Sequence, residues 1–203
     1  RDVDLEPPHA AWLAELALAA GLIVDDGELI PAFTPTPEFD VWRSRSAGAR
    51  WASVAQAWWE SPRAAYLVGT QGAGGATVGA LGQQVRWPAV RGVRADVLRE
   101  LAALPAGSAP TPESVTERVT WRRPLADRRT LTEATVAVLR EADWLGATAL
   151  GALSGLGRGL AVGASSAHLA ESADATLPPS VDHVLLQADL TAIAPGPLDG
   201  ALG

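Results

Sequence analysis

Residues 88–104, PAVRGVRADVLRELAAL, carry the strongest helix pattern in the chain. Pro88 suits the first turn of a helix, because its fixed φ is already helical. Apolar side chains recur behind it at i, i+3, i+7, i+8, i+11 and i+14, which places them on one face of a helix. They are Val90, Val93, Val97, Leu98, Leu101 and Leu104. The stripe predicts a helix that buries this face within a helix-dominated fold, and a central parallel sheet would contradict the prediction.

Two short β-hairpins are predicted, one near each end of the chain. Residues 10–20 have helical spacing and end at Gly21, where a C′ glycine belongs. A strand at 22–24, an Asp-Gly turn at 25–27 and a return strand at Leu29-Ile30 then predict a hairpin over about 22–32. Residues 181–194 hold two β-like stretches, VDHVLLQ and LTAIA, which predict the second hairpin. A helix that leads into a hairpin is how a winged helix ends.

The other segments are predicted to be helices joined by loops. Thr36 is expected to cap a helix that Pro37 opens, and the pattern Thr130-x-x-Glu133 is expected to act as a capping box. Further helices are predicted at 49–60, from Pro112, and over the glycine-rich segment 148–160, with loops at 64–83, 105–110 and 164–180. The predicted core contains Trp51, Trp58, Leu98, Leu101, Val138 and Leu145.

Composition excludes several classes of protein. The 203 residues are 48% hydrophobic and 19% charged, which is typical of a globular chain. Without Cys there is no disulfide framework, thiol nucleophile or Cys-ligated zinc, and without Lys there is no Walker A loop or Schiff base. The absence of Met leads us to expect a part of a longer protein. The apolar segment 145–163 holds Arg158, so we expect no membrane span.

No catalytic, cofactor or metal site is predicted. The glycine-rich loop at 69–79 has Thr77 where a dinucleotide fingerprint needs its third glycine, and Ser154 lacks the preceding glycine of a nucleophile elbow. His9, His168 and His183 have no metal-ligand spacing. We therefore expect neither an enzyme nor a bound cofactor in this segment.

Charge is distributed unevenly along the chain, whose net charge is −7. Residues 1–30 and 141–203 each hold one arginine against seven acids, whereas residues 31–140 hold 14 arginines against nine acids. Five arginines lie in 117–129 against two acids, close to Trp121, and four lie in 86–99 against Asp96. Such patches bind phosphate and stack on bases in nucleic-acid proteins. The alternative is a solvated arginine face with its tryptophan in the core, its charges neutralised by carboxylates elsewhere in the fold, for example in the acidic C-terminal third. If the partner is instead an anion such as DNA, the predicted contacting residues are Arg118, Arg122, Arg123, Arg128, Arg129, Arg91 and Arg94.

Several motifs in the sequence resemble a family of large actinobacterial helicase-associated proteins. These proteins carry the domain found at the N-terminus of XPB-type DNA helicases. The stretch 184–191, VLLQADLT, with Pro195-Gly196-Pro197-Leu198, is similar to the opening of that domain. Upstream similarities are Arg50-Trp51 with Trp58, the Trp-Arg-Arg-Pro motif at 121–124, the stretch 141–146 and the turn at 153–160. The resemblance extends over about residues 10–203.

The resemblance implies tandem winged-helix-like units and a role in DNA repair or remodelling, in the cytoplasm at the nucleoid. It divides the chain into a winged-helix-like unit at 1–48, a helical region at 49–110, a second winged-helix-like unit at 111–180, and a β segment at 181–203. No helicase motif is present, so an XPB-type helicase or other repair protein would be a partner. The helix at 10–20 has no arginine, and winged helices also dock proteins. The reading from the sequence is thus a non-enzymatic DNA-binding segment, with a protein-interaction scaffold as the alternative.

Overall fold

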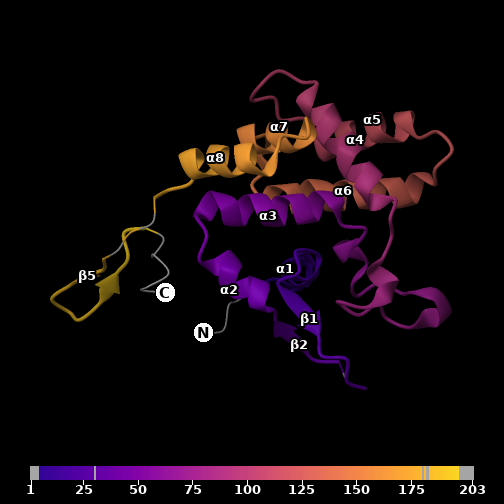
Figure 1. The fold of residues 1–203 in the computed structure, drawn as a ribbon. Coiled ribbons are helices and arrows are strands. Elements are labelled where there is room, and N and C mark those ends of the chain that lie inside the picture. The colour runs from indigo at the N-terminus through magenta and orange to yellow at the C-terminus, as the bar shows by residue number, and fades with distance from the viewer. Residues whose placement is uncertain (1–4, 30, 180, 182, 197–203) are drawn as a thin grey trace.

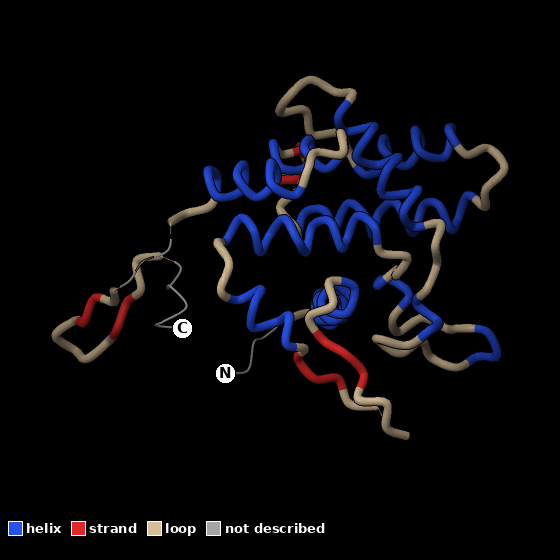
Figure 2. The backbone as a smooth tube through the Cα atoms, viewed as in Figure 1, coloured by secondary structure: helices blue, strands red, loops and turns tan. Residues whose placement is uncertain are grey.

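The computed structural model describes residues 5–29, 31–179, 181 and 183–196, and these form a mainly helical fold with short two-stranded antiparallel sheets. Figure 1 shows the helices gathered in one body, and Figure 2 shows how few residues are in strands. The α-helices are α1 (Pro7–Ala19), α2 (Pro37–Arg43), α3 (Ala47–Glu60), α4 (Val90–Ala102), α5 (Pro112–Arg122), α6 (Arg128–Trp144), α7 (Gly155–Ala161) and α8 (Ser166–Thr176). The strands are β1 (Ile23–Asp25), β2 (Phe33–Pro35), β3 (Thr148–Ala149), β4 (Ala152–Leu153), β5 (Leu185–Leu186) and β6 (Ala192–Ile193).

The stripe of residues 88–104 forms α4, which lies at the centre of the fold. It packs against α3, α5, α6 and α7, so its apolar face is covered from several sides. Val90, Val93, Val97 and Leu98 are fully buried there. One continuous hydrophobic cluster extends from α1 through α4 and α6 to α8.

Five of the six predicted core residues are buried: Trp58, Leu98, Leu101, Val138 and Leu145. The prediction is wrong for Trp51, which is only half-buried against the core. Its indole Nε1 donates a hydrogen bond to the Leu145 carbonyl oxygen at 2.8 Å, so the ring edge serves a polar contact at the border of the core.

Helix ends follow capping chemistry, with two differences from the prediction. The Asp127 carboxylate accepts from the Thr130 amide and begins α6, so the predicted capping box at Thr130 is wrong by one turn. Thr36 stands at the N-cap position of α2, but its hydroxyl donates to the Gly21 carbonyl instead of capping. Gly21 itself has φ +70° and closes α1 as predicted, with the amide of Leu22 bonded to the Ala17 carbonyl.

The two predicted hairpins are present. β1 pairs with β2, and the return strand is Phe33–Pro35 instead of Leu29-Ile30, because Asp26 holds a longer loop by accepting from the amides of Glu28 and Ala32. Ile30 lies outside the described residues. β5 pairs with β6, and Figure 1 shows this hairpin standing away from the helices. The 197–198 end of the Pro-Gly-Pro-Leu motif also lies outside the described residues.

Two segments differ from their predicted secondary structure. Residues 148–153 form the β3–β4 hairpin, whose turn places Leu150 at φ +52° and Gly151 at φ +80°, so the predicted helix 148–160 is reduced to α7. Residues 166–176 form α8 instead of a loop. α8 packs closely on α3 at Gly48, where a Cβ atom would collide with the backbone of Ala170. Tertiary packing on a small-residue face stabilises this helix more than its own pattern does.

Of the described residues, none belongs to a helix long and apolar enough to cross a membrane. Most of the segment 64–83 has no long helix or strand and contains short 3-10 turns, as the glycine content predicts.

Candidate nucleic-acid interface

The arginine-rich stretch forms a protruding corner where α5 ends and α6 begins. The chain turns between the two helices at residues 123–127, at the end of the molecule opposite α2 in Figure 1. We call residues 118–129 the α5–α6 corner. Both helices pack against α4, which holds the corner on the hydrophobic core through Val115, Val119 and Leu131.

Two buried carboxylates of α4 organise one half of the corner. Glu100 pairs with Arg122 and lies 3.6 Å from Nη1 of Arg118. Asp96 accepts from Nε of Arg123 and from Nη1 of Arg99, each at 2.5 Å. Three of the five corner arginines therefore fasten α5 to α4.

These three arginines still reach solvent. The side chains of Arg118 and Arg122 are 53% and 41% exposed, whereas Glu100 beneath them is 6% exposed. The Arg123 guanidinium lies over Gly92, where a Cβ atom would come within 2.5 Å of Nη2. The corner thus has positive groups on its outside and their negative partners on its inside.

Arg128 and Arg129 form the other half of the corner, and their side chains contribute little to the stability of the fold. Arg129 pairs only with Glu133, one turn along α6, and its side chain is 87% exposed. Arg128 is exposed as well, and no carboxylate in the described part of the chain forms an ion pair with it. The adjacent Asp127 stays ionised, because the hydrogen bond from the Thr130 amide holds the pKa of its carboxyl below the usual range.

Arg91 and Arg94 lie on α4 and have opposite environments. Arg91 is exposed and remains available to a ligand. Arg94 is 2% exposed, and its guanidinium donates to the carbonyl oxygens of Ser61 at 2.5 Å and Arg63 at 2.8 Å. This placement corrects the sequence-based assignment, because a group enclosed in the core does not reach a phosphate.

Arg94 belongs to a buried polar cluster with Glu141 and Trp58. Nη2 of Arg94 lies 3.5 Å from Oε2 of Glu141, and the same oxygen accepts from Trp58 Nε1 at 2.6 Å. The guanidinium also lies over the Trp58 ring, 5.1 Å from its centroid. Burial raises the pKa of Glu141 and lowers the pKa of Arg94, while their mutual attraction opposes both changes. The cluster ties α3, α4 and α6 together.

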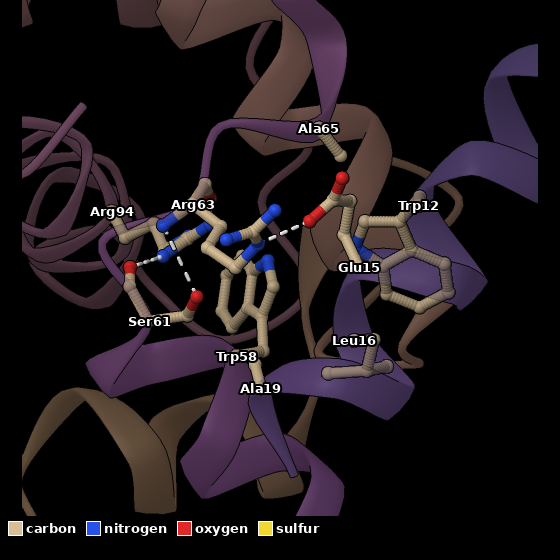
Figure 3. Close-up of a pocket in the computed structure, with 9 residues that line it drawn as sticks. All are labelled: Trp12, Glu15, Leu16, Ala19, Trp58, Ser61, Arg63, Ala65 and Arg94. Atoms are coloured by element: carbon tan, nitrogen blue, oxygen red, sulfur yellow. Dashed lines mark hydrogen bonds and ion pairs between the residues drawn. The ribbon is translucent and has the colours of Figure 1, made fainter. Parts of the chain in front are cut away.

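A second buried pair lies beside it, as Figure 3 shows. Glu15 of α1 pairs with Nε of Arg63 and accepts from the Leu81 amide at 2.5 Å, and Arg63 donates to the Gly82 carbonyl at 2.8 Å. These bonds fasten α1 to the loop that precedes α4. The cavity between the two clusters has a volume of about 10 Å³, close to that of one water, so it excludes an organic ligand.

Two hollows flank the α5–α6 corner. One, with a volume of about 420 Å³, is lined by Glu100, Glu117, Arg118, Trp121 and Arg122. The other, of about 730 Å³, runs along α6 between Arg129 and Arg140 and is bounded by Tyr66 and Gln71. Both are open to solvent and both share arginines with the corner. Within the described residues, no three His, Asp or Glu side chains gather as a metal site would require.

The sequence predicted that five arginines lie close together, but it did not identify the carboxylates that pair with them. The neutralising acids come from α4, and not from the acidic C-terminal third of the chain. A signal was present, because Asp96 and Glu100 are four residues apart, as are Arg118 and Arg122. That spacing places each pair on one helical face, and two such faces of opposite charge are suited to pack together.

No family model, curated protein or solved structure matches this chain. The resemblance to helicase-associated proteins therefore stays a prediction.

Proposed function

We propose that this chain is a non-enzymatic DNA-binding segment that contacts phosphates through the α5–α6 corner. One observation carries the proposal: Arg128 and Arg129 are exposed and have no essential part in the fold, and they adjoin three more half-exposed arginines. Glu100 and Asp96 offset the repulsion among Arg118, Arg122 and Arg123, whereas Arg128 has no ion-pair partner among the described residues and Arg129 pairs only with an exposed glutamate. Phosphate accepts the paired N–H groups of arginine especially well.

The order of elements supports a winged-helix-like reading of this region. Three mutually packed helices, α4, α5 and α6, are followed directly by the β3–β4 hairpin. In helix-turn-helix proteins the second helix enters the major groove by its N-terminal residues, while the first crosses the backbone. Arg128 and Arg129 occupy the N-terminus of α6, and Arg118 and Arg122 lie on α5. We propose that α5 and α6 with β3–β4, within the unit at 111–180, bind DNA in this orientation, while α1 with β1–β2 belongs to the winged-helix-like unit at 1–48.

The biological setting that we propose comes from the sequence resemblance. It makes an XPB-type helicase or another repair protein the partner, and DNA repair or remodelling at the nucleoid the process. The acidic unit around α1 is then the surface for protein docking, because a helix without arginine is poorly suited to phosphates.

A protein-interaction scaffold is the second candidate function, and the exposed apolar side chains of the corner favour it. Trp121 is 82% exposed and Leu125 is fully exposed. Exposed aromatic groups of this size are enriched in protein interfaces. Contact through phosphates and contact through apolar groups respond differently to the loss of charge, so one experiment separates the two functions.

The experiment is equilibrium binding of a fluorescent duplex of about 20 base pairs, measured by anisotropy at low salt. Three proteins are compared: wild type, Arg128→Ala/Arg129→Ala, and Arg43→Ala/Arg45→Ala. The last removes the same charge from the end of α2 and the residues after it, away from the corner.

We expect the corner variant to bind about tenfold more weakly, which corresponds to about 1.4 kcal/mol for two lost phosphate contacts. The α2 variant should stay within about twofold of wild type, because only a weak long-range attraction is lost. Equal losses in both variants would contradict a corner site, and no binding by the wild type to this duplex or to a single strand of the same length would leave the scaffold function.

A further inference from the structure

The exposed side chain of Trp121 has no role in the fold. Val119 faces the core, and Trp121 follows two residues later, rotated by about 200° around α5. Its ring therefore points to solvent. A large aromatic side chain left 82% exposed on an otherwise well-packed helix is the kind of feature that marks a binding site.

The surroundings of Trp121 are suited to a flat, polar, uncharged group attached to an anion. The hollow beside the indole, of about 420 Å³, is open to solvent, so a nucleic-acid strand has access to it. Arg118 and Arg122 line it together with their partner Glu100, and Glu117 adds a second carboxylate to the wall. Carboxylates accept hydrogen bonds from the exocyclic amino groups of bases, and guanidinium groups bind phosphate.

A paired base does not present its face to such a ring. Inside a duplex both faces of a base are covered by its neighbours, so stacking on a protein side chain requires a single strand or an unstacked site. Trp121 lines the hollow together with Arg118 and Arg122, and an aromatic side chain beside guanidinium groups is how single-strand-binding proteins stack a base next to its phosphate.

We infer that the α5–α6 corner binds single-stranded DNA in preference to duplex, with an unpaired base stacked on Trp121 in the hollow beside it. The inference rests on the proposed function, and it adds the form of DNA and the residue that selects it. Arg118 and Arg122, which line the same hollow, then bind the phosphate next to the stacked base, and Arg128 and Arg129 bind phosphates farther along the strand.

The test compares two fluorescent probes, an oligodeoxythymidine and a duplex, each of about 20 nucleotides per strand. The proteins are wild type, Trp121→Ala, Trp121→Phe and, as a matched control, Leu125→Ala, which trims a fully exposed apolar neighbour. Thermal unfolding of each variant confirms the fold first, and little change is expected because both side chains are exposed.

Wild type should bind the single strand more tightly than the duplex. Trp121→Ala should weaken single-strand binding by roughly 5- to 100-fold and duplex binding by less than about threefold, since base stacking supplies the difference. Trp121→Phe should retain most of the affinity, and Leu125→Ala should resemble wild type.

An oligonucleotide with abasic sites keeps the phosphates and removes the bases, so it isolates the stacking contact. Wild type should bind this probe about as weakly as Trp121→Ala binds the thymidine strand. If the affinity changes neither with the abasic probe nor in Trp121→Ala, the inference is overturned while the proposed function stays in place. Failure to bind either probe would overturn both, and would point to a protein partner at Trp121.

Discussion

The side chain of Arg122 serves both the fold, through its pair with Glu100, and the proposed function, through its exposure at the α5–α6 corner. Arg122→Ala leaves Glu100, only 6% exposed, with Arg118 at 3.6 Å as its remaining partner. Breaking a fully buried pair costs about 3–5 kcal/mol, but Arg122 is 41% exposed and solvent screens its interaction. We therefore expect a loss of about 1–2 kcal/mol in the free energy of unfolding. In a protein of this size that loss lowers Tm by about 2–8 °C.

Urea and thermal unfolding followed by circular dichroism measure this loss. The variants are Arg122→Ala, Glu100→Gln, their combination, and Arg128→Ala as a control at an exposed arginine of the same corner. The double variant should lose about 1 kcal/mol less in the free energy of unfolding than the two single losses added together, because both single changes remove the same pair. The control should stay within about 0.5 kcal/mol of wild type. An Arg122→Ala protein as stable as Arg128→Ala would refute this role for the α4 carboxylates.

The remaining predictions concern the core and its one tyrosine. Arg94→Met should cost about 3–5 kcal/mol in unfolding experiments, because it leaves Glu141 charged and buried, and adding Glu141→Gln should recover much of that loss; a fully stable Arg94→Met would contradict the cluster. Burial and nearby glutamates raise the pKa of Tyr66 to about 12, so ultraviolet titration of this single tyrosine should show a midpoint near 12 that returns toward 10 in denaturant. Because the folded pKa is the higher one, stability should fall as pH rises from about 10 to 12, and a folded midpoint near 10 would show that the ring is not desolvated. Gly48→Ala should destabilise by about 1–3 kcal/mol because its Cβ meets the α8 backbone, whereas Gly155→Ala, with open space around it, should change stability little; equal effects would argue against close α3–α8 packing.

Local patterns predicted the parts of the fold that local forces determine. The α4 stripe, the glycine that closes α1 and the presence of the two terminal hairpins follow from spacing or turn chemistry within a few residues. The position of the return strand β2 does not, because the Asp26 loop moves it from Leu29-Ile30 to Phe33–Pro35. The helix α8 does not, because its sequence is small and polar, and it is stabilised by close contact with α3 across Gly48. That contact joins segments more than a hundred residues apart in sequence, so no local sequence pattern predicts it.

The candidate interface also combines features that local sequence predicts with features that only tertiary packing determines. The five corner arginines are neighbours in sequence, and this proximity was enough to bring them together. Arg94 carries the same charge as Arg91 but lies on the inner face of α4, where Glu141 and backbone carbonyls surround it. Residue type alone predicts an exposed arginine, and only the fold shows a buried one. Trp121, by contrast, is exposed although most tryptophans of this chain are at least half-buried.

The salt dependence of DNA affinity tests the central claim most directly. Each phosphate contact lowers the slope of log affinity against log salt concentration by about 0.9 for duplex DNA. With a duplex probe, between about 50 and 200 mM salt, wild type should give a steep negative slope, and Arg128→Ala/Arg129→Ala should flatten it by about 1.8. The Arg43→Ala/Arg45→Ala control should keep the wild-type slope. A slope that is the same in wild type and the corner variant would contradict phosphate binding at the α5–α6 corner.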